Sequence, residues 1–213
     1  MRINIGCGQT PTAGWRNFDN SLSLWLAKIP LLPELLKRIN FLGPQQYENI
    51  LFARSSNIER LDATRGFPFP DETVDVVYSS HMLEHLDQSE ARIFLSEAKR
   101  ILISGGILRL AVPDLRKQVD RYVTSGNADE FIAGTRMCVP RPRTIQEKIK
   151  YLFIGGRHHQ WMYDGQSLCR LLQSSGFVNV QEVPPGETRI PDPGVLNLRE
   201  RISESVYVEA EKA

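Results

Sequence analysis

Short runs of Val, Ile and Leu alternate along the chain with stretches of helical periodicity, and this alternation constrains the fold most strongly. The apolar runs are continuous, as expected for strands that are covered on both faces in a parallel sheet. We expect strands at residues 2–5, 16–19, 58–61, 74–79, 106–112, 178–183 and 205–210. The pattern therefore predicts an α/β protein with a mostly parallel sheet of seven strands.

Capping residues mark the ends of two expected helices. Asp87 and Glu90 form a capping-box pattern ahead of an apolar helical face, and Gly105 with Gly106 follows as a stop signal. A second helical pattern begins at Asp164. Because these helices alternate with the expected strands, they support the α/β prediction.

Two connections are longer than an ordinary crossover. We expect them to be inserts, at about 21–55 (the first insert) and 123–156 (the second insert), within a single domain that spans residues 1–213. Apolar side chains near the start of the first insert, such as Trp25 and Leu26, predict either a lid over a bound ligand or a crossover helix packed on the sheet. Both alternatives stay open at this point.

Length, charge and cysteine content exclude several classes of protein. A chain of 213 residues can bury a core without disulfides, and its formal net charge of +1 gives no electrostatic signal for nucleic acid. No apolar run is long enough to span a membrane, and the first residues lead directly into a strand, which leaves no room for a signal peptide. We therefore expect a cytoplasmic protein with reduced cysteines at Cys7, Cys138 and Cys169.

A glycine turn follows the first expected strand. Gly6, Cys7 and Gly8 form a GxG sequence, in which the backbone can approach a ligand closely and direct its amide groups at it. The dinucleotide fingerprint GxGxxG is absent, because Gln9, Thr10 and Pro11 follow. The turn predicts a cofactor site and disfavours a nicotinamide cofactor.

Acidic residues end the second and third expected strands. Asp19 is placed to accept hydrogen bonds from both hydroxyls of a ribose, which fits an adenosine-containing cofactor. The alternative is that Asp19, with Asn20 and Ser21, caps the next helix. Asp62 could accept a hydrogen bond from the amine of an adenine, or could be a turn carboxylate.

The segment from Phe67 to Leu86, FPFPDETVDVVYSSHMLEHL, is the most specific part of the sequence. Together with the glycine turn and residues 14–19, 105–115, 158–164 and 174–177, it closely resembles the class I S-adenosylmethionine-dependent methyltransferases. The nearest subgroup is the short, type 11-like methyltransferase-domain proteins that act on small molecules or glycans.

The resemblance implies a Rossmann-like three-layer sandwich with strand order 3-2-1-4-5-7-6 and strand seven antiparallel. The family usually has a helix before the first strand, and we expect this first N-terminal helix to be missing here because the sequence begins at that strand. Another segment should then cover the cofactor, S-adenosylmethionine, and we expect residues 22–42 or the second insert to do so. The cofactor-binding residues that the resemblance implies are Gly6, Cys7, Gly8, Asp19, Asn20, Asp62, Ala63, Ser80 and His81.

A general base would assist transfer to a hydroxyl or ammonium acceptor. His81 is the first candidate and His159 the second, although histidines here could also serve only in packing or lie in loops. The sequence His81 to His85 also reads as HxxEH, a zinc-peptidase signature. We disfavour that alternative because His81 directly follows a buried strand, and we expect no metal.

The predicted function is methyl transfer from S-adenosylmethionine to a small-molecule or sugar acceptor, with the methylated atom left open. The alternative is a non-catalytic protein that binds the cofactor. Nucleic acid is not expected as a partner, and a homodimer stays open. A basic group in the second insert predicts either an anionic acceptor or a solvated face. Its members are Arg136, Arg141, Arg143 and Lys148.

Overall fold

The computed structural model describes residues 1–138, 143–144, 148 and 158–213. Arg141 of the basic group and most of the later part of the second insert lie outside these residues. Among the residues described, no helix is long and apolar enough to cross a membrane.

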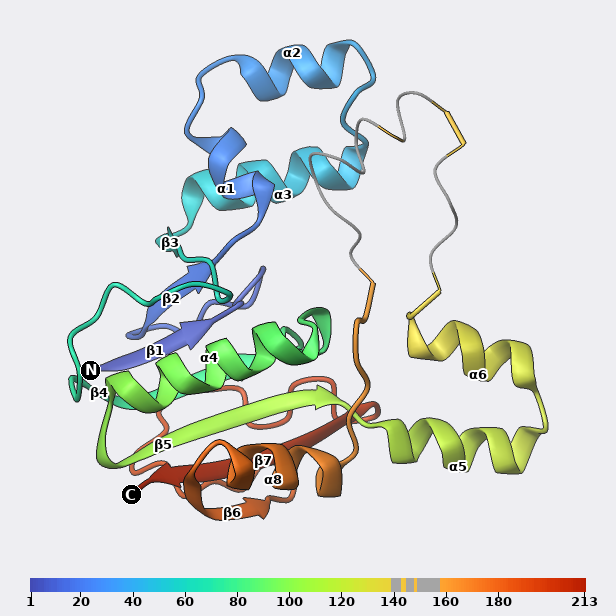
Figure 1. Cartoon of the computed structure of the whole chain (residues 1–213). Coiled ribbons are helices and arrows are strands. Elements are labelled where there is room, and N and C mark those ends of the chain that lie inside the picture. The colour runs from blue at the N-terminus through green and yellow to red at the C-terminus, as the bar shows by residue number, and fades with distance from the viewer. Residues whose placement is uncertain (139–142, 145–147, 149–157) are drawn as a thin grey trace.

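One sheet of seven strands, in the order β3-β2-β1-β4-β5-β7-β6, forms the centre of the fold (Figure 1). Strands β1 to β5 run parallel to one another, whereas β7 is antiparallel to both of its neighbours. The strand order and the antiparallel seventh strand are confirmed. The strands are β1 (Arg2–Ile5), β2 (Arg16–Asp19), β3 (Ile58–Arg60), β4 (Val74–Ser80), β5 (Leu102–Pro113), β6 (Phe177–Glu182) and β7 (Ser205–Lys212).

Helices α4 and α8 cover one face of the sheet, in front of it in Figure 1. Asp87 begins α4 with the expected capping box, since its carboxylate accepts from the amides of Ser89 and Glu90. Asp164 begins α8 in the same way. The helices are α1 (Leu22–Ala27), α2 (Leu32–Arg38), α3 (Pro44–Ser55), the 3-10 turn η1 (Leu83–His85), α4 (Gln88–Ile101), α5 (Leu115–Ser125), α6 (Ala128–Thr135) and α8 (Gly165–Ser174).

The expected helix stop at Gly105 and Gly106 is wrong. Helix α4 ends at Ile101, and β5 begins at the next residue, because Leu102 already pairs with Val74 of β4. Gly105 instead sits within β5 at a φ of 74°, a left-handed conformation that favours glycine. The glycines therefore lie within a long strand, where its register with β4 shifts, rather than at the end of a helix.

Extended segments, rather than helices, cover the opposite face of the sheet. The connection between β1 and β2, residues 6–15, contains no helix, and neither do residues 184–204 between β6 and β7. From the latter segment Ile190 and Leu196 pack against Val76 and other apolar side chains of the sheet. Loop residues from the distant carboxyl-terminal part of the chain therefore pack on this face of the sheet.

Three short helices make up the first insert. Helices α1, α2 and α3 pack on one another around a separate small core that includes Leu26, Leu42 and Ile50. They lie beyond the β2–β3 edge of the sheet (Figure 1). The alternative of a crossover helix packed on the sheet is therefore wrong, and the single-domain organisation stays a prediction.

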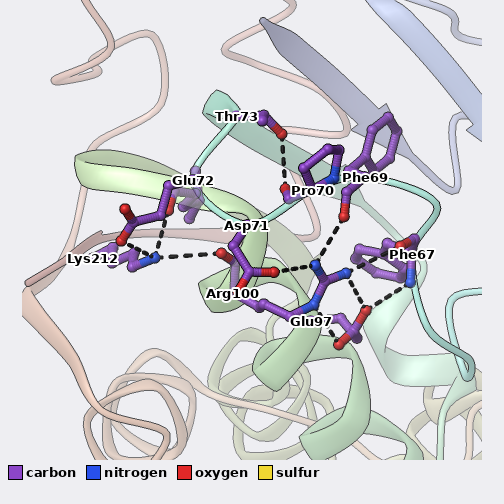
Figure 2. Close-up of polar contacts among 10 residues, drawn as sticks. Phe67, Phe69, Pro70, Asp71, Glu72, Thr73, Glu97, Arg100 and Lys212 are labelled. Atoms are coloured by element: carbon purple, nitrogen blue, oxygen red, sulfur yellow. Dashed lines mark hydrogen bonds and ion pairs between the residues drawn. The ribbon is translucent and has the colours of Figure 1, made fainter.

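Arg100 of α4 fixes the connection between β3 and β4. Its guanidinium donates to the carbonyls of Phe67 and Phe69 at 3.0 and 2.8 Å and pairs with Glu97 and Asp71, both at 2.7 Å (Figure 2). One side chain thus satisfies backbone acceptors that no strand or helix could satisfy at this position. This explains how a connection rich in proline and phenylalanine is ordered ahead of β4.

Arg109 of β5 and Glu209 of β7 form a fully buried ion pair between two adjacent strands of the sheet. Both side chains are 0% exposed, and the charged atoms are 2.6 Å apart. Arg109 also donates to the carbonyls of Glu187 and Leu198, at 2.9 and 3.3 Å. The pair therefore anchors the segment 184–204 to the sheet.

We expect Arg109→Met to lower the free energy of unfolding by about 3–5 kcal/mol, because it leaves the Glu209 carboxylate buried without its main counter-charge. Urea denaturation would measure the change. Arg16→Met is the matched control, since Arg16 and Glu59 form an ion pair that is 44% and 46% exposed, and its cost should be about 0–1 kcal/mol. Equal costs for the two variants would contradict the anchoring role of Arg109.

Candidate cofactor and active site

The carboxyl ends of parallel strands meet at one edge of the sheet, and the predicted site residues gather there. Strand β1 pairs with β2 on one side and with β4 on the other, so the residues after these three strands are neighbours. The amide of Leu61, after β3, donates to the carbonyl of Asp19 at 3.1 Å and places the next residues at the same edge. This is the edge at which open α/β sheets bind ligands.

Backbone hydrogen bonds to β2 hold the glycine turn at Gly6 and Cys7, and the space around Gly8 is open. The amides of Gly6 and Cys7 donate to the carbonyl of Phe18 at 2.8 and 3.1 Å. Gly6 has a φ of 75°, and a Cβ there would lie 2.5 Å from Cγ of Met82, so only glycine fits. Around Gly8, by contrast, no atom lies within 4 Å of a Cβ position. The turn therefore has free space at Gly8.

Cys7 is buried within this turn. Burial, together with the negative charge of Asp19, raises the pKa of its thiol to about 12. The side chain is therefore a neutral thiol near pH 7 and contributes packing rather than a nucleophile.

Asp19 connects the glycine turn to the start of the first insert. Its carboxylate accepts from the amide of Gly8 at 3.0 Å and from the amide of Ser21 at 2.6 Å. Ser21 is the N-cap of α1, and Asp19 holds its amide, so a role of this segment at the start of the helix remains an alternative to ribose binding. Because each carboxylate oxygen can accept more than one hydrogen bond, both retain capacity for ligand hydroxyls. The residues present therefore fit an adenosine cofactor.

Asp62 forms the turn that the sequence left as an alternative. Its carboxylate accepts from the amide and the hydroxyl of Thr64, at 3.0 and 2.7 Å, and lies 3.3 Å from Nε of Arg65. Ala63 is buried beside it, and Asn20 accepts from a neighbouring arginine. The roles of these residues toward an adenine stay predictions.

His81 follows β4 at a sharp bend. Its φ is 50°, and its buried ring lies with Nε2 2.8 Å from Oγ of Ser205. Nδ1 faces Glu84, with 3.4 Å between this atom and Oε1. The side chain of Glu84 is 1% exposed, and neither of its oxygens has a hydrogen-bond partner.

His159 approaches the same carboxylate from a different part of the chain. It is buried, and its Nε2 lies 4.0 Å from Oε1 of Glu84. Burial lowers the pKa of His159, although the charge of Glu84 opposes this shift. The ring of the exposed residue His85 packs edge-on against it, with centroids 5.1 Å apart. Both predicted bases therefore converge on Glu84, which sequence reasoning had considered only within the HxxEH pattern.

The zinc-peptidase alternative does not fit this geometry. It requires His81 and His85 on successive turns of one helix. Here His81 lies before the three-residue turn η1, in a left-handed conformation. The two histidines therefore do not present a pair of ligands from one helical face.

Two further contacts, to Gln9 and Thr10 directly after the glycine turn, come from segments that the sequence did not connect with it. Glu200 accepts from the hydroxyls of Thr10 and Tyr78, at 3.1 and 3.0 Å. On the other side, the amide group of Gln9 donates to Asn49 of α3 at 2.6 Å. The first insert and the segment 184–204 thus flank the turn, and no periodic pattern in the sequence signals either contact.

Three of the four residues of the basic group lie in the described part of the chain. Arg136, Arg143 and Lys148 are exposed. The carbonyl of Arg136 accepts from the amide of His159 at 3.0 Å, which brings this arginine beside the histidine cluster.

Comparisons with known proteins agree with this geometry. The methyltransferase domain family matches residues 3–110, about half of the chain. No curated protein matches the chain.

Many solved structures resemble the fold, among them three methyltransferases. A SAM-dependent methyltransferase from Archaeoglobus fulgidus is 16% identical, with a TM-score of 0.53, over 99% of this chain and 85% of that one. A SAM-dependent, possible histamine N-methyltransferase from Thermotoga maritima is 16% identical, with a TM-score of 0.51, over 100% and 81%. One from Methanosarcina mazei is 14% identical, with a TM-score of 0.51, over 99% and 91%. On the evidence of the family match, the strand order and the site at this edge, the chain belongs to the methyltransferase domain family and is a class I S-adenosylmethionine-dependent methyltransferase.

Proposed function

We propose that this enzyme transfers the methyl group to a small-molecule or sugar acceptor bound beside the carboxyl end of β4. The main support for cofactor binding at this edge is the hydrogen bond from the amide of Gly8 to Asp19. The space around Gly8 is open. When bound, S-adenosylmethionine supplies a methyl group that its sulfonium already activates. The protein then needs mainly to align the reactants and exclude water.

We assign the cofactor contacts by position along the edge of the sheet. The backbone of Gly6 and Gly8 would meet the methionine part, and Asp19 with Asn20 would hold the ribose. Asp62 and Ala63 would flank the adenine. Cys7 would pack beneath the cofactor, and Ser80 with His81 would lie near the reacting centre, since these two residues end β4.

Two observations bear on the acceptor. The histidine cluster lies next to Ser80, so an acceptor at this point would meet imidazole groups that could take up a proton. Arg136 lies beside His159 and supplies a positive charge there, which favours an acceptor with an anionic group. The net charge of +1 does not favour a polyanionic partner.

We infer that the first insert covers the cofactor. Its helices have a core of their own, and α3 reaches the glycine turn through the contact between Asn49 and Gln9. This contact supports a covering role, since a segment next to the turn could exclude water from a bound cofactor.

We expect Asp19→Ala to weaken binding of S-adenosylhomocysteine by about 100-fold, because hydrogen bonds to a charged acceptor are lost and the amide of Gly8 is released. Isothermal titration calorimetry would measure the affinity. Asp75→Ala is the matched control, since Asp75 lies at the opposite end of β4 and pairs with the amino terminus. If folded Asp19→Ala retained the wild-type affinity, the cofactor assignment would be wrong.

A second experiment addresses the cover. Replacing residues 22–55 with a flexible linker of about twelve residues should leave the sheet folded and lower the affinity for S-adenosylhomocysteine. Asn49→Ala, which removes only the contact to Gln9, should have a smaller effect in the same direction. Circular dichroism would confirm folding, and unchanged affinity in the shortened chain would exclude a covering role for the first insert.

A further inference from the structure

The ion-pair contacts of the buried Glu84 carboxylate that the structure describes are to histidines and not to a lysine or an arginine. Its side chain is 1% exposed, and neither carboxylate oxygen has a hydrogen-bond partner. Buried charges in proteins are almost always paired and hydrogen-bonded, or bind a metal. Imidazole nitrogens of His81 and His159 lie 3.4 and 4.0 Å from this carboxylate, and the buried hydroxyl of Tyr163 also interacts with its charge.

The hydrogen bonds of His85 and His81 indicate which ring nitrogen carries the proton. Nδ1 of His85 lies 3.1 Å from the carbonyl oxygen of His158 and must donate to it, which leaves Nε2 with a lone pair in the neutral ring. In His159, Nδ1 lies 3.3 Å from the sulfur of Met162, and the ring also makes a hydrogen bond to the backbone of Thr135. Nε2 of His159 faces Oε1 of Glu84 at 4.0 Å.

His81 repeats the pattern. The hydroxyl of Ser205 donates to the carbonyl of Arg201 at 2.9 Å, so Nε2 of His81 must be the donor to Ser205. In the neutral ring this leaves the Nδ1 lone pair facing Glu84 at 3.4 Å. Electron-rich atoms therefore converge on one buried carboxylate, an arrangement that a cation would stabilise.

We propose that Glu84, His85 and His159 form a binding site for a divalent transition-metal ion. Each of them offers one ligand atom, and these atoms all lie within 4.8 Å of one another. Two ligands that are each about 2.1 Å from a shared ion lie about 3 to 4 Å apart, so small side-chain shifts close the site. Two imidazoles with one carboxylate suit ions such as Zn²⁺, Fe²⁺, Co²⁺ and Mn²⁺.

The surrounding backbone already positions these ligands. The carbonyl of Glu84 accepts from the amides of Gln160 and Trp161, at 2.7 and 3.2 Å, and so holds the segment with His159 against η1. The donation from Nδ1 of His85 to a backbone carbonyl is the outer contact that orients most metal-binding histidines. This set differs from the peptidase pattern, because His159 takes the place of His81, and it replaces our expectation that no metal is bound.

Three protein ligands leave coordination positions free for water or another oxygen ligand. The site adjoins His81 at the end of β4, so an acceptor oxygen could occupy a free position and be polarised by the ion. This role in methyl transfer rests on the proposed function. Binding of the metal does not, and can be measured without cofactor or acceptor.

The test uses the full chain, stripped of metal with a chelator and titrated with Co²⁺. We expect one Co²⁺ per chain, visible ligand-field absorption and a higher unfolding temperature in the presence of the ion. His85→Ala should lower the affinity at least 10-fold and abolish the thermal shift. His85 is exposed, so its removal should leave the fold intact.

His158→Ala is the matched control, because it removes an adjacent imidazole but keeps the carbonyl that His85 contacts. It should retain wild-type affinity for Co²⁺. The proposal is overturned if the folded wild-type chain binds no Co²⁺, if His85→Ala binds it equally well, or if His158→Ala loses binding to the same extent. S-adenosylhomocysteine affinity, measured on the same samples, reports separately on the cofactor site.

Discussion

The hydrogen bond from Gly8 to Asp19 is the contact on which the proposed cofactor site depends. Strands β1 and β2 are joined by only a short loop, whereas parallel strands are usually joined through a packed helix. With no helix in this connection, side-chain and backbone contacts must hold the glycine turn in place. Asp19 provides these contacts on one side and Glu200 on the other. The same carboxylate that is suited to bind ribose therefore also shapes the turn.

The buried pair of Arg109 and Glu209 serves the site indirectly. It fastens the segment 184–204 to the face of the sheet on which the described part of the chain places no helix, and this segment brings Glu200 to Thr10, just after the glycine turn. The segment thus replaces a helical layer and also supplies a contact to the site. The position of Glu200 beside the glycine turn therefore depends on the buried ion pair between β5 and β7.

Glu84 links the two halves of the proposed active site. It lies just after β4, near the expected position of the cofactor, and its backbone and side chain both contact the segment that contains His159. A metal at this point would explain why a carboxylate is buried among imidazoles. It would also place an electrophilic centre beside the proposed acceptor, although the cofactor chemistry itself requires no metal.

The sequence alone determined the strands, their α/β class and the residues that follow them, because continuous apolar runs, capping boxes and glycine turns are local signals. The resemblance to a known family then supplied the strand order. Only the tertiary structure decided that Glu84 meets His159, that Glu200 and Asn49 flank the glycine turn, and that α4 passes directly into β5. These contacts join residues far apart in the chain through packing and strand pairing, and neither leaves a periodic pattern in the sequence.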